Sequence, residues 1–171
     1  MKRVLISVLL EVVTIFYGFP ANAISDAYQQ YLDNRKSKAD AGDSKAEASL
    51  GTAYSMGRDL PQNDAEAVKW WRKAAEQGDV RGETMLGTAY MGGKGVIADK
   101  VEAAKWFRKA AEQGDPTGKA MFGQVSYLGI GVPQDKPLGM KLMRQAAEQG
   151  DPLAMSFLRM HHIPVKVTVG E

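Results

Sequence analysis

Small and apolar residues recur along the chain in sets spaced i, i+3, i+4, i+7, i+8 and i+11, with polar residues between them. This spacing follows the period of an α-helix and places each set on one helix face. The sets are Ala46, Ser49, Leu50, Ala53, Tyr54 and Gly57; Gly82, Met85, Leu86, Ala89, Tyr90 and Gly93; and Gly118, Met121, Phe122, Val125, Ser126 and Gly129. Each set predicts a helix with a single packing face.

A second kind of helix follows each of these segments, and its packing face combines large residues with alanine or glycine. A large side chain that faces small ones lets two helices approach closely. The sets are Ala67, Trp70, Trp71, Ala74 and Ala75; Ala103, Trp106, Phe107, Ala110 and Ala111; and Gly139, Leu142, Met143, Ala146 and Ala147. The chain is therefore predicted to be all-α and built from helix pairs. The three tryptophans are assigned to the core rather than to a ligand site.

An internal repeat organises these helix pairs. The segment Ala75–Asp79 returns at Ala111–Asp115 and at Ala147–Asp151, in two steps of 36 residues, and a weaker copy lies at Ala39–Asp43. Such a period is the signature of a solenoid. The predicted units are repeats at 43–78, 79–114 and 115–150, an N-terminal capping helix at 24–42, and a C-terminal capping helix with a tail at 151–171.

The helix ends carry their own signals. Glycines 78, 114 and 150 stand where a chain leaving a helix turns left-handed, and the Asp that follows each can cap the next helix. Pro116 and Pro152 suit a first helical turn. Asn63 with Glu66, and the equivalent pair in the next unit, have capping-box spacing. Local signals therefore agree with the repeat.

The repeat motif resembles a known family. Leu-Gly-x-x-Tyr is followed by a glycine turn such as Gly93-Lys94-Gly95-Val96, an Asp, and Ala-x-x-Trp-x-x-Lys-Ala-Ala-Glu-Gln-Gly. This pattern, over Asp43 to Asp151, resembles the Sel1-like repeats, which are relatives of the tetratricopeptide repeats. The resemblance implies a right-handed superhelix with a concave inner face and a role as adaptor or scaffold, often in exported bacterial proteins. The third unit departs from the motif at Ser126, Gly139 and Leu142.

The first 23 residues predict an export signal. Lys2 and Arg3 precede a mostly apolar run, and Pro20-Ala21-Asn22-Ala23 ends in the small-x-small pattern that signal peptidase accepts. Glu11 interrupts the run, and the rival interpretations are an uncleaved anchor or a helix of the soluble fold. Cleavage after Ala23 predicts a periplasmic or secreted protein with no stable membrane anchor. The chain has no cysteine, so the core alone must hold it together.

The sequence gives little support for catalysis or for a cofactor. The formal charge of +2 provides no polybasic footprint for nucleic acid. Gly114 to Lys119 looks like a phosphate loop, but it is one residue short and follows a helix instead of a strand. His161 and His162 are the only histidines, and adjacent helix residues point apart, which disfavours a shared metal. No nucleophile-plus-base arrangement is visible. We therefore predict neither an enzyme nor a metal or cofactor site.

The C-terminal tail is predicted to be extended rather than helical. Ile163, Val165, Val167 and Val169 alternate with other residues, which is a period-two pattern. The tail either covers the last helix, as a capping element would, or is flexible, as chain ends often are.

By the resemblance, the first helix of each unit lines the concave side, and its inward residues would contact a protein partner. These positions are Lys45, Thr52 and Ser55 in the first unit, Arg81, Thr84, Thr88 and Met91 in the second, and Thr117, Gln124 and Tyr127 in the third. Met91 and Tyr127 are candidate anchors, because exposed Met and Tyr are typical of protein contacts. Arg81 is the candidate for meeting an acidic group.

Two functions follow from this interpretation. The first is a periplasmic protein-interaction module, either a scaffold or an immunity protein that neutralises a secreted effector such as a lipase. The alternative is a hydrolase of cell-wall or β-lactam substrates, an activity claimed for some exported relatives. Those relatives are cysteine-rich, and this chain has no cysteine. The residues therefore favour the interaction module.

Overall fold

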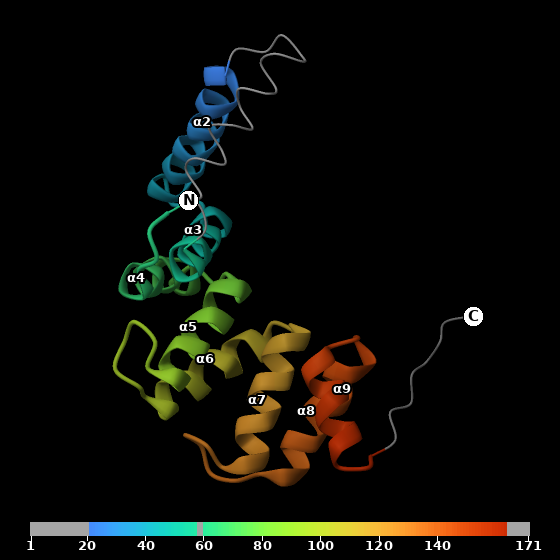
Figure 1. Ribbon diagram of the computed structural model, residues 1–171. Coiled ribbons are helices and arrows are strands. Elements are labelled where there is room, and N and C mark those ends of the chain that lie inside the picture. Colours follow the sequence, from blue (N-terminus) through green and yellow to red (C-terminus); the bar gives the residue numbers. More distant parts are fainter. Residues whose placement is uncertain (1–20, 58–59, 164–171) are drawn as a thin grey trace, which may run out of the picture.

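The chain folds into a succession of helices. The computed structural model describes the backbone of residues 21–57 and 60–163, and every regular element in that part is an α-helix (Figure 1). The all-α prediction is confirmed. Most of the predicted export signal, at 1–20, and the tail at 164–171 lie outside the described residues. The helices are α2 (Ala21–Asp40), α3 (Ser44–Met56), α4 (Asp64–Glu76), α5 (Val80–Gly92), α6 (Lys100–Glu112), α7 (Pro116–Leu128), α8 (Lys136–Glu148) and α9 (Pro152–Met160).

The helices form a solenoid in which each packs against the next in the sequence (Figure 1). The first helices of successive units also contact one another, because α3 touches α5, α5 touches α7 and α7 touches α9. Among the described helices, no such contact joins the successive second helices α4, α6 and α8. The first helices are thus the more closely spaced row, and the stack curves toward them. They line the concave side.

Repeated caps set the start of every first helix. Asp43 accepts a hydrogen bond from the backbone N–H three residues into α3, and Asp79, Asp115 and Asp151 do the same for α5, α7 and α9. The glycine before each of these aspartates has a left-handed backbone, with φ between 81° and 88°. Both cap predictions are confirmed. Each cap typically contributes about 1 kcal/mol.

The predicted capping boxes at the start of the second helices form only in part. The Asn63 side chain accepts from the Glu66 N–H at 3.0 Å, as expected. The Glu66 carboxylate does not return to the cap; it pairs with Lys69 at 2.9 Å. The N–H of Asn63 donates instead to the carbonyl of Tyr54, at the end of the preceding helix. The Asn63 N–H is therefore satisfied by the first helix of the same pair, and it does not need the Glu66 carboxylate as an acceptor.

The core consists of large second-helix rings set against first-helix glycines. A Cβ built on Gly51 would lie 2.6 Å from Trp71 Cδ1, and one on Gly87 would lie 2.6 Å from Phe107 Cε1. The three tryptophans, at positions 70, 71 and 106, are only 6–7% exposed, which confirms their assignment to the core. Close approach at glycine is therefore what lets one large ring per unit fill the space between paired helices.

The last described helix, α9, differs from the other first helices. Helix α9 has Arg159 where the other first helices have a glycine, and this arginine is exposed. A bulky ring could not approach α9 at this position as Trp71 and Phe107 approach the glycines of α3 and α5. The ring of His161 packs 4.5 Å from that of Phe157 and 5.4 Å from that of Tyr127. No helix in the described part of the chain is long and apolar enough to span a bilayer.

Candidate partner-binding groove

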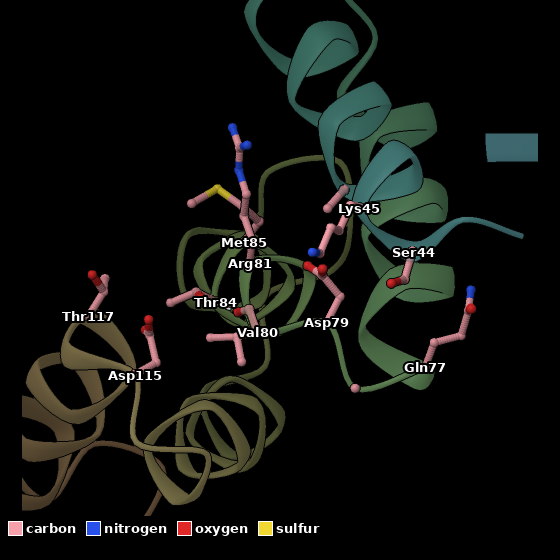
Figure 2. A pocket seen from close by; sticks show the side chains of 12 residues that line it. Ser44, Lys45, Gln77, Asp79, Val80, Arg81, Thr84, Met85, Asp115 and Thr117 are labelled. Atoms are coloured by element: carbon pink, nitrogen blue, oxygen red, sulfur yellow. Dashed lines mark hydrogen bonds between the residues drawn. The ribbon is translucent and has the colours of Figure 1, made fainter. Parts of the chain in front are cut away.

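The concave side carries a hollow of about 740 Å³ at the N-terminal ends of the first helices. Because the repeat relates α3, α5 and α7 by similar steps, these ends lie along one edge of the concave side. Lys45 of α3, Arg81 of α5 and Thr117 of α7 border the hollow (Figure 2). We call this hollow the polar compartment. Its other lining residues are Ser44, Ala48, Gln77, Gly78, Asp79, Val80, Thr84, Met85 and Asp115.

Two cations dominate the electrostatics of the polar compartment. Lys45 and Arg81 are exposed, and neither makes an ion pair within the described residues. The carboxylates of Asp79 and Asp115 also line the hollow, but each accepts a backbone N–H of its own helix as an N-cap. The helix N-termini add partial positive charge. The two carboxylates keep their charge but lie half-buried at these termini, so the exposed charge that a partner meets first is that of the two cations.

A second hollow of about 460 Å³ continues the groove toward the C-terminal ends of α3 and α5. Met85 lines both hollows, so they adjoin. We call this one the apolar compartment, because most of its wall is carbon. At its rim, Lys94 is neutralised by Asp64 at 3.2 Å and also donates to Ser55 Oγ at 3.3 Å. The lining residues are Thr52, Ser55, Met56, Trp71, Met85, Thr88, Ala89, Gly92 and Lys94.

Three threonines of the groove use their hydroxyl hydrogens within their own helices. Thr52 Oγ1 donates to the carbonyl of Ala48 at 2.9 Å, and Thr88 Oγ1 donates to that of Thr84 at 2.8 Å. Thr84 Oγ1 likewise donates to the carbonyl of Val80. Each hydroxyl hydrogen is thus used within its own helix, a common arrangement for a helical threonine. At Thr52 and Thr88 a partner would therefore meet a methyl group and an oxygen acceptor, but no free hydroxyl donor.

The structure brings seven of the ten predicted contact residues to these two compartments. Lys45, Arg81, Thr84 and Thr117 line the polar compartment, and Thr52, Ser55 and Thr88 line the apolar compartment. Thr84 is only 4% exposed and contributes to the floor.

The remaining three predicted contact residues line neither compartment. Met91 is half-buried against the core formed around Phe107. The ring of Tyr127 makes an edge contact with that of Phe157 at 5.2 Å, and Lys136 lies over it. Gln124 is half-buried on α7. The two residues expected to anchor a partner are thus partly occupied by packing within the chain.

Two methionines outside the predicted contact residues also line the groove. Met85 falls on the packing face by its spacing, yet it is half-exposed between α3 and α5, where it separates the compartments. Met56, the last residue of α3, is 56% exposed. A helical period locates a packing face but not its edge, and these residues lie at the edge.

A ladder of polar pairs, each with a buried glutamate and an exposed glutamine, lies beneath the groove. Gln77 Nε2 donates to Glu47 Oε2 at 2.6 Å, and Gln113 Nε2 donates to Glu83 Oε2 at 2.8 Å in the next unit. Both glutamates are 3% exposed. Burial raises the pKa of both carboxyl groups above the ordinary value, although the Gln113 bond and the charge of Lys109 partly offset this for Glu83.

In the third unit a lysine replaces the glutamate of the ladder, and its hydrogen bond to the glutamine is kept. Lys119 stands where the other units have glutamate, and Gln149 stands where they have glutamine. With its amide oriented to satisfy both atoms, Gln149 accepts from Lys119 Nζ at 2.9 Å and donates to the carbonyl of Gly114 at 3.2 Å. An amide both donates and accepts, so it accommodates either a carboxylate or an ammonium group.

Removing the charge of Glu83 should flatten part of the pH dependence of stability. A raised pKa in the folded state means that the fold holds the proton more tightly than the unfolded chain does. The free energy of unfolding therefore falls as the pH rises above about 4.3, the ordinary glutamate pKa. Glu83→Gln keeps an oxygen acceptor for Gln113 and removes this loss. Thermal melts should show the variant more stable than the parent near neutral pH, with the difference vanishing in acid.

The matched control for this prediction is Glu76→Gln, since Glu76 is exposed on α4. The same chemical change at this position should leave the melting temperature close to that of the parent at every pH. Equal behaviour of the two variants would contradict the assignment of the pH dependence to burial at Glu83.

The candidates for other chemistry find no support as a site. The ring of His161 packs against that of Phe157. The segment from Gly114 to Lys119, which resembles a phosphate loop in sequence, is the junction after α6 followed by the capped start of α7. Within the described residues, no group of three or more histidine or acidic side chains could hold a metal ion.

The fold and groove define an α-solenoid repeat protein, and comparison with known families specifies which kind. The family model of the Sel1 repeat matches this chain three times, at residues 44–79, 80–115 and 120–151. The chain belongs to the Sel1 repeat family. Sel1 repeats typically mediate protein–protein interaction. No match was found among curated proteins.

Solved structures agree with this assignment. A Sel1 repeat protein from Oxalobacter formigenes is 38% identical with a TM-score of 0.69, over 77% of this chain and 98% of its own. A protective antigen present in uropathogenic Escherichia coli strains, which displays an SLR fold, is 35% identical with a TM-score of 0.72. That match covers 81% of this chain but only 30% of the antigen. Cysteine rich protein B of Helicobacter pylori, at 24% identity and a TM-score of 0.58, over 76% of this chain and 93% of its own, shares the fold.

Proposed function

We propose that this chain is an exported interaction module that binds a protein partner in the groove formed by α3, α5 and α7. The observation that carries the proposal is the pair of adjoining compartments, one cationic and one apolar, on the concave side. A concave surface with separate polar and apolar contacts suits recognition of another chain. The repeats are committed to packing, and the side chains of the groove are left available.

The proposed location rests on the residue pattern of 1–23, and the finer role follows from it. A short solenoid released into the periplasm would suit a soluble sequestering protein, such as an immunity protein that covers a secreted effector. A scaffold of an envelope assembly would use the same groove. Both roles require a protein partner in the compartment to which the chain is exported.

Purification of the chain from the periplasm tests both parts of the proposal. A C-terminally tagged full-length chain, produced in the bacterium that carries its gene, should be recovered in the periplasmic fraction with its N-terminus at Ile24. A defined protein should copurify with it, and Arg81→Glu should lower the recovery of that protein. Mass spectrometry of the intact chain and of the copurified band gives both readouts.

Two results would count against the proposal. Retention of the chain in the cytoplasm with residues 1–23 intact would remove the exported location. A chain that purifies alone at native expression level, with crosslinking in intact cells also finding no partner, would remove the interaction role. Lys141→Glu is the control variant, because it makes the same charge change on exposed α8, away from the groove.

A further inference from the structure

The two compartments of the groove restrict the chemistry of what can bind there. The polar compartment presents Lys45 and Arg81, whose charges are not neutralised by an ion pair within the described residues. Its two carboxylates are held by backbone N–H groups as helix caps. These carboxylates are half-buried at helix N-termini, whose partial positive charge offsets part of theirs, whereas the two cations are exposed. The exposed charge of the compartment therefore favours an acidic partner.

The apolar compartment favours an aliphatic or thioether side chain beside that acid. Its wall includes Met56, Met85 and one edge of Trp71, and its threonine hydroxyls are already bonded within their helices. Methionine side chains adapt their shape to different apolar groups. The lysine at the rim is neutralised by Asp64, so this end of the groove does not attract a second acid.

The spacing of the compartments follows from the geometry of α5. Arg81 and Met85 lie on this one helix four positions apart, and Thr88 lies three further along. At about 1.5 Å per residue, the cation and the apolar wall are separated by roughly 6 to 10 Å along the helix. An extended peptide advances about 3.3 Å per residue. An acid and an apolar residue two or three positions apart would therefore reach both compartments.

We propose that the groove recognises an extended acidic segment of the partner, with a carboxylate against Arg81 and Lys45 and an apolar side chain two or three positions away against Met56 and Met85. The inference rests on the proposed function and names the chemistry of the partner at that same site. Because the contact is charge-assisted at one end only, the affinity falls with rising ionic strength while the apolar contribution persists.

Synthetic peptides test the proposal without knowledge of the natural partner. The probe is a short Gly/Ser peptide with Glu-Glu-Ser-Leu at its centre, carrying a fluorophore, and titrated with the full chain in an anisotropy assay. One comparison peptide replaces both Glu with Lys, and another replaces Leu with Ser. We expect saturable binding of the first peptide and binding at least about tenfold weaker for each of the others. Equal binding of all three, or no saturable binding, would overturn the inference.

Variants of the chain locate the binding. Arg81→Glu and Met56→Ser should each weaken the acidic peptide about tenfold, whereas the matched changes Lys141→Glu and Val101→Ser, both exposed on second helices, should not. Circular dichroism confirms that the four variants remain folded. A loss with Lys141→Glu as large as with Arg81→Glu would mean that the peptide senses only net charge, and the inference would be wrong.

The outcome is separable from that of the periplasmic purification. If a partner copurifies and binds Arg81→Glu and Met56→Ser as tightly as the parent chain, the interaction role stands, and both the acidic-segment inference and the use of this groove fall. If the peptides behave as expected but no partner is found in the cell, the recognition chemistry stands and the proposed cellular role falls.

Discussion

Replacing Gly131 with alanine is expected to lower the free energy of unfolding by about 3 kcal/mol, combining a strained backbone with a steric clash. Gly131 has φ of 70°, and a Cβ at this position would lie 2.0 Å from the carbonyl oxygen of Lys100 and 2.9 Å from the Val101 nitrogen. These atoms are the backbone of the first turn of α6, in the preceding unit. Flexible side chains cannot relieve the clash, so the loop itself would have to move.

The same contact recurs one unit earlier, where a Cβ on Gly95 would lie 2.2 Å from the carbonyl oxygen of Asp64. The loop inside each of these units thus rests on the second helix of the unit before it. In a solenoid, stability depends on such interfaces between neighbours. Gly95→Ala should therefore have a similar effect, and it should also broaden the denaturant transition as the units uncouple, measured by urea unfolding followed by circular dichroism.

Two other glycines separate the causes of this loss. Gly114 has φ of 88° but no atom within 4 Å of a built Cβ, so Gly114→Ala should show only the backbone cost, about 1 kcal/mol. Gly92 lies at the end of α5 with open space around it, so Gly92→Ala should be neutral or slightly stabilising. Equal losses at Gly131 and Gly114 would show that the contact with α6 contributes nothing.

The helices and their register could be predicted from the sequence because the information is local and repeated. The step of 36 residues is seen in the Gly-Asp pairs, in which the glycine follows the end of one helix and the aspartate caps the next. The burial of Trp70 and its counterparts followed from the same register. A helical period repeated three times reduces the ambiguity of any single unit.

The edges of the groove were harder to predict, because they depend on which side chains of neighbouring helices cover one another. Met91 and Ser55 occupy equivalent positions, yet Ser55 lines the apolar compartment and Met91 packs on the core. Met85 is counted in the packing stripe by its spacing and also forms a wall of the groove. These environments depend on contacts with helices far apart in the sequence, and the local spacing of residues does not encode such contacts.

The ladder of polar pairs could have been predicted from the sequence. The glutamine in the Glu-Gln-Gly motif is constant in all three units, while its partner thirty positions earlier is Glu47, Glu83 or Lys119. A polar residue retained at a helix end against partners of opposite charge indicates a bond made by an amide. Comparing the units at this spacing would have revealed the ladder.

Phe107→Ala is expected to destabilise the fold by about 3 to 5 kcal/mol, the usual loss for a fully buried phenylalanine. The ring is 2% exposed and lies in the core with Phe122 and Val125, in the middle unit of the stack. The cavity would open at the contact between α5 and α6, and that pair connects the two halves of the solenoid. Val101→Ala, at a position that is 52% exposed on the same helix, should cost little by comparison.

A double-mutant cycle between Gly87 and Phe107 tests whether the glycine is needed only because of the ring. Alone, Gly87→Ala should be destabilising, because the new methyl group would lie 2.6 Å from Phe107 Cε1 and 2.8 Å from Cδ1. With Phe107→Ala the clash disappears, and the nearest remaining atom is the Ala103 carbonyl oxygen at 3.2 Å. The methyl group would then fill part of the cavity.

We therefore expect the double variant to be more stable than the sum of the two single losses predicts, by at least about 1 kcal/mol, in urea unfolding experiments. Gly92→Ala combined with Phe107→Ala is the control pair, since a Cβ built on Gly92 would point into open space, and its effects should be additive. Additive losses of stability for Gly87→Ala and Phe107→Ala would contradict a direct contact between the two positions. In that case, the glycine would be required by the backbone of α5 itself, and the shared small-and-large pattern of the units would need another physical reason.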